Sequence, residues 1–124
     1  MAKFVDYQKT RTFMVGVGSD AQGVGNEIFV DIPKNSIVTV KAAVAVPFNG
    51  TTPTLTVTDT AGKTYVNSAD LATAGLKGGG DGFLSADGSV KIEVGGSGST
   101  TGTAFVSVTY INEELSDGTW SNEG

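Results

Sequence analysis

The chain has 124 residues, the size of a single domain with one modest hydrophobic core. It contains no cysteine and no histidine, which excludes disulfide bonds, thiolate metal sites and histidine-based catalysis. The net charge is −5, but residues 112–124 hold four acids and no base, so the rest of the chain carries only −1. Without a basic surface to displace counterions from phosphates, nucleic-acid binding is not expected.

The first twelve residues, MAKFVDYQKTRT, lack the apolar stretch of a secretory signal peptide. No run of the chain approaches the roughly 18 apolar residues that a membrane-spanning helix needs. We therefore expect synthesis in a cytoplasm and no membrane partner.

Residues 1–8 are interpreted as an N-terminal arm, and the β-pattern begins after them. Residues 9–17 alternate apolar and polar side chains, which indicates a strand. A glycine-rich loop follows and contains a G-x-G-x-x-A match at residues 16–21. A dinucleotide fingerprint needs a helix directly after it, and here a strand at residues 27–32 follows instead, so a turn is the better interpretation.

The clearest pattern lies in residues 32–59. Apolar side chains recur at every second position from Val38 to Val46, and again at Leu55 and Val57. Pro47 and the Asn49-Gly50 pair separate the two strands. The second strand presents Thr54, Thr56 and Thr58 on its other face, which suits a solvated sheet surface or a surface for polar lateral contacts.

The second half of the chain continues with short elements. A strand at residues 63–66 is followed by a predicted helix near residues 68–75, with Ser68 as its N-cap and Leu71 and Leu76 as its anchors. Residues 77–82, KGGGDG, are expected to be a loop. Three strands, at residues 83–84, 90–94 and 103–111, complete the pattern.

These elements predict an all-β fold, a two-sheet antiparallel β-sandwich of jelly-roll type with about eight strands and one short helix. The sandwich would span residues 9–111, between the arm and an acidic C-terminal tail at residues 112–124.

Few residues invite a catalytic interpretation. Asp81 and Asp87 are the closest candidates for a carboxylate pair, but each precedes a glycine, which favours turns. Residues 78–83 resemble one repeat of a calcium-binding β-helix, yet a single repeat cannot form such a site. We therefore expect neither an enzyme nor a cofactor or metal site.

The ends of the chain carry the candidate protein contacts. Trp120 is the only tryptophan and lies in the acidic tail, although tryptophan is enriched where large areas are buried between proteins. Phe4 and Tyr7 lie in the N-terminal arm, and Arg11 begins the first strand on the parity of its apolar residues. We predict that these four residues contact other subunits.

Six segments of the chain, taken in order, resemble the small virion proteins of tailed bacteriophages. They are IPKNSIVTVKAAVAV, PFNGTTPTLTV, SADLATAGL, SVKIEV, SGSTTG and TAFVSVTY. The resemblance covers residues 27–111 and is strongest to the jelly-roll decoration, or cement, proteins that coat capsids. It implies a structural protein on the capsid surface, made in the host cytoplasm. It further implies the major capsid protein as partner and self-association as a dimer or trimer. No active-site residues are carried over.

Two alternatives stay open: a tail or fibre component of the same virion, and a carbohydrate-binding module. The second would need an aromatic platform, but the aromatic residues of the body lie mostly at positions expected in the core or within strands.

Overall fold

The computed structural model describes residues 9–23 and 25–112, and the structural statements below concern these residues. They form eight β-strands and one turn of 3₁₀-helix, η1 (Ser19–Ala21). The strands are β1 (Lys9–Gly18), β2 (Ile28–Ile32), β3 (Ser36–Val46), β4 (Thr51–Asp59), β5 (Thr64–Asp70), β6 (Gly75–Leu84), β7 (Gly88–Ser97) and β8 (Thr103–Asn112). No helix in the described part of the chain is long and apolar enough to cross a membrane.

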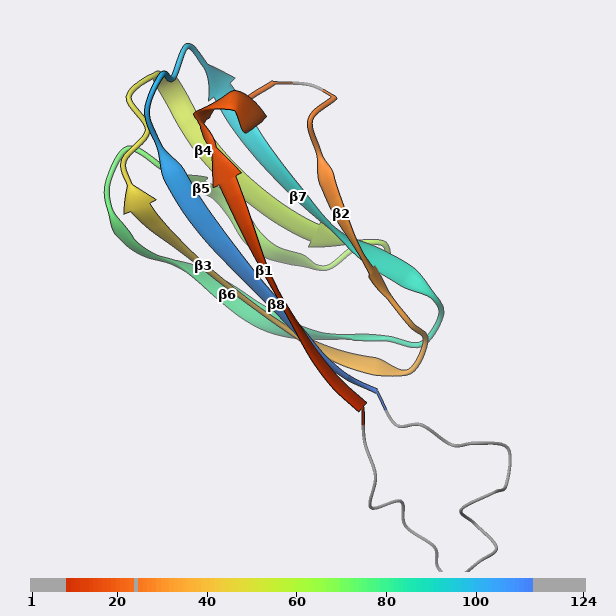
Figure 1. Cartoon of the computed structure of the whole chain (residues 1–124). Coiled ribbons are helices and arrows are strands. Elements are labelled where there is room, and N and C mark those ends of the chain that lie inside the picture. The colour runs from red at the N-terminus through yellow and green to blue at the C-terminus, as the bar shows by residue number, and fades with distance from the viewer. Residues whose placement is uncertain (1–8, 24, 113–124) are drawn as a thin grey trace, which may run out of the picture.

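The strands form two four-stranded antiparallel sheets, in the orders β1-β8-β3-β6 and β2-β7-β4-β5 (Figure 1). Strand β1 pairs with β8, β2 with β7, β3 with β6 and β4 with β5. These pairs are nested as in one long hairpin whose turn lies between β4 and β5. The hairpin is rolled up so that β3 also pairs with β8, and β4 also pairs with β7. It is the jelly-roll arrangement, so the predicted fold class is confirmed.

The core lies between the two sheets and follows the alternation of the sequence. In β3, Val38, Val40, Ala42 and Val44 are buried, whereas Val46 is exposed at the end of the strand, contrary to the prediction. The other strands contribute Leu55 and Val57 from β4, Val90, Ile92 and Val94 from β7, and Ala104, Val106, Val108 and Tyr110 from β8.

The predicted helix near residues 68–75 is not formed. Residues through Asp70 belong to β5, which pairs with β4, and a short loop then leads into β6 at Gly75. Asp70 Oδ1 accepts a hydrogen bond from the Ala72 amide at 2.9 Å, which turns the chain in place of a helix cap. Two turns of helix are marginal on their own, and the backbone of this segment finds better partners in the sheet.

Leu71 was predicted to anchor the helix, and in the structure it anchors the loop between β5 and β6. It is fully buried, its amide donates to the Pro53 carbonyl at 3.0 Å, and its carbonyl accepts from the Phe48 amide at 2.9 Å. Leu76, the other expected anchor, is 81% exposed.

The glycine-rich segment at residues 77–82 is part of strand β6 and not a loop. Its backbone pairs with β3 in the register Gly80 to Val40 and Gly82 to Val38, with a bulge beside Ala42 and Ala43. Glycine suits this strand because Tyr65 from β5 packs against it: a Cβ on Gly82 would stand 3.0 Å from Cζ of Tyr65 and closer still to its hydroxyl oxygen.

A buried polar pair closes the turn between β4 and β5. Tyr65 donates its hydroxyl proton to Asp59 Oδ2 at 2.7 Å, while Asp59 Oδ1 accepts from the amides of Ala61 and Lys63 at 2.9 and 3.0 Å. Both side chains are buried, and burial, the hydrogen bond to Asp59 and the negative charges of Asp59 and Asp81 raise the pKa of Tyr65 above its ordinary value. The Asp59 carboxylate therefore stabilises the turn between β4 and β5.

Candidate interaction surfaces

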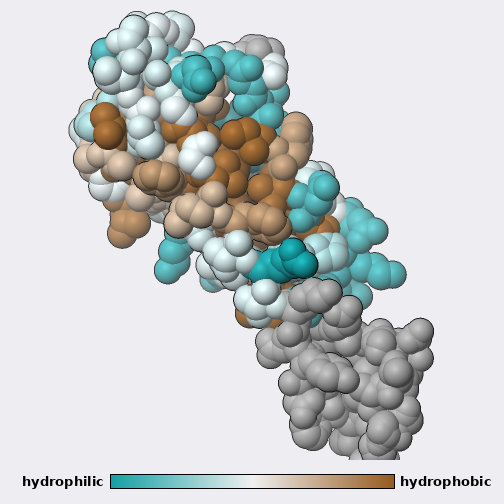
Figure 2. Space-filling view, viewed as in Figure 1, coloured by the Kyte–Doolittle hydropathy of each residue, from teal (hydrophilic) through white to brown (hydrophobic). Residues whose placement is uncertain are grey.

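The outer face of the β1-β8-β3-β6 sheet carries most of the exposed large apolar side chains of the described residues. We call these six residues the apolar face: Met14, Ile37, Leu76, Phe83, Phe105 and Ile111. In the view of Figure 2, hydrophobic residues gather over the middle of the body, where Figure 1 draws β1 and β8. Soluble monomers rarely keep such a concentration of apolar side chains on one sheet face, so this face indicates an interaction surface.

The strand register arranges the apolar face in rows that cross the sheet. The first row joins Ile111, Ile37 and Phe83 on β8, β3 and β6. The fourth row, at the other end of the strands, joins Phe105, Ala43 and Leu76, with Phe105 lying against Gly16 of β1. Two separate apolar clusters therefore lie about six residues apart along β8.

The two rows between these clusters are more polar. The second row runs Thr12, Thr109, Thr39 and Asp81 across all four strands. Its hydroxyls and carboxylate are linked by a 3.1 Å contact between Thr12 and Thr109 and a 2.9 Å hydrogen bond from Thr39 to Asp81. The third row runs Met14, Ser107, Lys41 and Gly79, and both Met14 and Lys41 are exposed.

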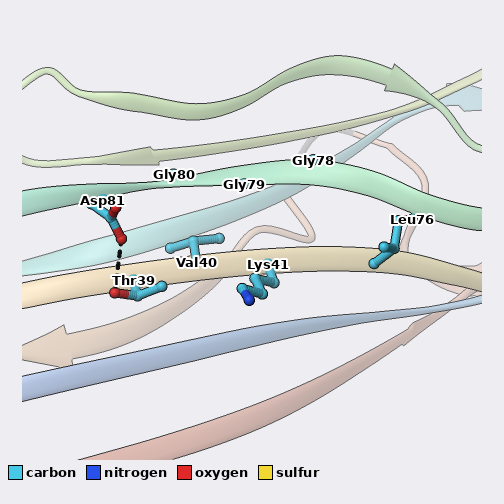
Figure 3. Close-up of a pocket in the computed structure, with 8 residues that line it drawn as sticks. All are labelled: Thr39, Val40, Lys41, Leu76, Gly78, Gly79, Gly80 and Asp81. Atoms are coloured by element: carbon cyan, nitrogen blue, oxygen red, sulfur yellow. Dashed lines mark hydrogen bonds between the residues drawn. The ribbon is translucent and has the colours of Figure 1, made fainter.

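An open hollow of about 320 Å³ lies on this face between β3 and β6. Figure 3 shows the hydrogen bond from Thr39 to Asp81 at one end of it and Leu76 at the other. Gly78, Gly79 and Gly80 of β6 are among the residues that line it. It makes the surface between β3 and β6 recessed.

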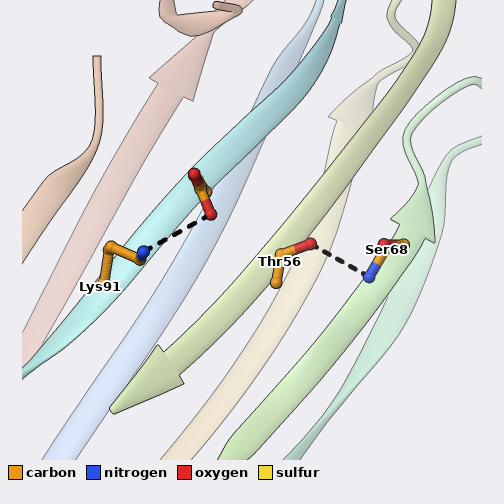
Figure 4. Close-up of polar contacts among 4 residues, drawn as sticks. Thr56, Ser68 and Lys91 are labelled. Carbon is orange, nitrogen blue, oxygen red and sulfur yellow. Dashed lines mark hydrogen bonds and ion pairs between the residues drawn. The ribbon is translucent and has the colours of Figure 1, made fainter. Parts of the chain in front are cut away.

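The outer face of the other sheet is chemically different. Thr54, Thr56 and Thr58 point outward from β4 beside Lys91 and Glu93 of β7, and we call these five residues the threonine face. Figure 4 shows its contacts: Lys91 Nζ lies 3.8 Å from Glu93 Oε1, and the Ser68 amide donates to Thr56 Oγ1 at 3.2 Å. Phe29 of β2 is its large exposed apolar neighbour.

The predicted contact residues are placed only in part. Arg11 is exposed on the edge strand β1, opposite Tyr110 in the register. Phe4, Tyr7 and Trp120 lie outside the described residues, so their role stays a prediction.

The carboxylates weighed as a catalytic pair have separate structural partners. Asp81 lies within β6 and binds Thr39, while Asp87 lies in the turn before β7 and accepts the Lys34 amide at 2.8 Å. Within residues 9–23 and 25–112, no three or more acidic, histidine or cysteine side chains are grouped so that they could hold a metal ion.

The apolar face was missed by the sequence interpretation, although a signal for it is present. Ile37 and Phe105 occupy the strand parity opposite to the core residues, as do Ile111 and Met14. Each is unremarkable alone, because single exposed apolar residues are common. Only the pairing of β3 with both β8 and β6 brings them into shared rows.

No protein-family model and no curated protein matches this sequence. Among solved structures, the fold is similar to the crystal structure of the infectious bursal disease virus VP2 subviral particle, with a TM-score of 0.52 and 14% sequence identity. The match covers 97% of this chain and 35% of that chain, so this chain spans about a third of the VP2 chain. At this identity the likeness is one of fold: the chain has a jelly-roll fold similar to that of the VP2 chain.

Proposed function

We propose that the chain is a structural component of a virion and, more specifically, a decoration protein that binds the outer surface of a bacteriophage capsid. The observation that carries the proposal is the jelly-roll topology over nearly the whole chain, shared with the VP2 subviral particle. The resemblance of residues 27–111 to phage cement proteins supports the finer assignment.

The two sheet faces suit such a role. The threonine face offers hydroxyl groups and one ion pair for polar contacts, and the apolar face offers area for hydrophobic contacts. A protein with two contact surfaces can bridge neighbouring subunits of a shell. Repetition over a lattice then turns individually weak contacts into firm attachment.

The experiment is cryo-electron microscopy of particles of the virus that encodes the chain. A decoration protein gives density of the size of this sandwich at equivalent positions over the whole shell. Density confined to a tail or fibre would overturn the decoration assignment and support the alternative virion role. Absence from purified particles would overturn both.

Adding the purified chain back to capsids that lack it gives a second test. Binding should saturate at a fixed number of copies per shell and raise the temperature at which the shells release their DNA. Unchanged release would contradict a stabilising role.

A further inference from the structure

We propose that two copies of this chain associate through their apolar faces, so that two β1-β8-β3-β6 sheets pack against each other. The proposal does not depend on a virion role, because it concerns the isolated chain in solution. Its basis is the arrangement of apolar and charged side chains on this sheet.

When the sheet of a second copy is turned over so that its rows run in the opposite order, the apolar rows of the two copies face each other. A two-fold axis in the plane of the contact, perpendicular to the strands, places the first row of one copy over the fourth row of the other. Ile111, Ile37 and Phe83 then meet Phe105, Ala43 and Leu76 of the second copy, and the reverse contact forms as well. Both apolar clusters are covered, as a symmetric interface requires.

The same axis pairs the two charged side chains of the face. Lys41 lies in the third row on β3, and Asp81 lies in the second row on the neighbouring strand β6. Reversal of the rows brings Lys41 of each copy next to Asp81 of the other, on adjacent strands. Both side chains line the open hollow between β3 and β6, which gives them room. Association is therefore favoured by opposite charges.

The size of the face is near what a specific dimer needs. Four strands at about 4.8 Å spacing and seven residues at about 3.3 Å rise give a plane of roughly 450 Å² per copy. The two copies together bury roughly 900 Å² before the relief of the side chains is counted, close to the ~1,000 Å² lower bound for a biological interface. Packed sheets of this kind lie about 10 Å apart.

The threonine face is the control surface, because its chemistry does not favour association with a second copy. It presents hydroxyls and one ion pair, and among the described residues Phe29 is its one large exposed apolar neighbour, so it favours solvent or a polar partner. Phe29 and Phe83 form a matched pair, since both lie on edge strands and are 60% and 57% exposed. A charge introduced at either position should be tolerated by the monomer fold.

The test is sedimentation equilibrium of the full chain at several concentrations. We expect a species of about twice the 12.6 kDa chain mass. Phe83→Asp should raise the dissociation constant at least tenfold, and Phe29→Asp should leave it unchanged. A chain that stays monomeric, forms trimers, or responds equally to both substitutions would overturn the proposal.

A charge exchange tests the geometry. Lys41→Asp and Asp81→Lys should each weaken the dimer, and the double variant should restore it, because each new pair again joins opposite charges. Circular dichroism confirms that each variant is folded. Failure of the double variant to recover, with its fold intact, would overturn the proposed axis. Loss of the dimer in a chain ending at Asn112 would assign association to residues 113–124 and overturn the proposal as well.

Discussion

At the scale of single residues, the hydrogen bond between Tyr65 and Asp59 is the most consequential polar contact of the core. Its donor and acceptor are both buried, and the carboxylate also holds the amides of Ala61 and Lys63. Removing the hydroxyl leaves Asp59 Oδ2 without its 2.7 Å partner. We expect Tyr65→Phe to lower the free energy of unfolding at pH 7 by about 1.5–3 kcal/mol, as for other hydrogen bonds to charged groups. Urea titration followed by circular dichroism measures the loss, and a change below about 0.5 kcal/mol would contradict it.

The raised pKa of Tyr65 makes a further prediction about pH. The unfolded chain releases the tyrosine proton near pH 10, whereas the folded chain retains it, so above about pH 10 the unfolded state binds fewer protons. The stability contributed by the protonated hydroxyl is complete below pH 10 and declines as pH rises from there towards the folded pKa. The stability difference between wild type and Tyr65→Phe should therefore shrink above pH 10 and stay constant from pH 7 to 9. A difference that grows with pH would refute this assignment.

A close contact in the loops beyond the strands gives a steric prediction. Gly102 has a φ of +144°, and a Cβ on it would stand 2.5 Å from Cγ of the buried Phe48 ring. Gly98 also has a positive φ, +79°, but open space around the position of its Cβ. We expect Gly102→Ala to destabilise the fold by about 2–4 kcal/mol, from strain and overpacking together, and Gly98→Ala by about 1 kcal/mol, from strain alone. Thermal unfolding of the two variants separates the effects, and equal losses would mean that the Phe48 contact is unimportant.

At the scale of elements, the strands with a buried face were predictable because their side chains alternate. The period of two in β3, β7 and β8 is a direct record of which face meets the core. The prediction for residues 68–82 was wrong because this segment has no such alternation. Its helix-forming residues and its glycines carry local preferences only, while its structure depends on hydrogen bonds to the distant strands β3 and β4. Tyr65, seventeen residues from Gly82, explains why a glycine suits that strand, and no local pattern contains this contact.

The two leucines of this segment test the corrected structure. Leu71 is fully buried and Leu76 is 81% exposed, although a helix would have made both of them anchors. We expect Leu71→Ala to lower the free energy of unfolding by about 2–5 kcal/mol through lost burial and a cavity. Leu76→Ala should change it by less than about 0.5 kcal/mol in the monomer. Chemical denaturation at low protein concentration makes this comparison, and similar losses at both positions would contradict the observed loop and strand.

At the scale of the whole molecule, the jelly roll follows from the sequence in kind, but its surfaces do not. Strand count and spacing predict two sheets, whereas the order β1-β8-β3-β6 decides that Ile111, Ile37 and Phe83 share a row. The distribution of exposed side chains between two faces is a property of pairing between strands far apart in the chain. The sequence interpretation placed contacts at the two ends of the chain, whereas the structure shows exposed apolar side chains gathered on one sheet face.

The contributions of the C-terminal tail and of the sheet face can be separated by truncation, because the last described residue belongs to the folded body. Lys9 pairs with Asn112, and the Asn112 side chain donates to the Lys34 carbonyl at 2.7 Å, so Asn112 belongs to the folded body. A chain that ends at Asn112 should therefore unfold at the same denaturant concentration as the full chain, while one that ends at Ile111 should be less stable. If Trp120 and its neighbours contact the shell, the chain ending at Asn112 should bind capsids more weakly than the full chain and still dimerise. Unchanged capsid occupancy would leave the threonine face as the shell contact, because the truncated chain keeps this face and the dimer covers the apolar face.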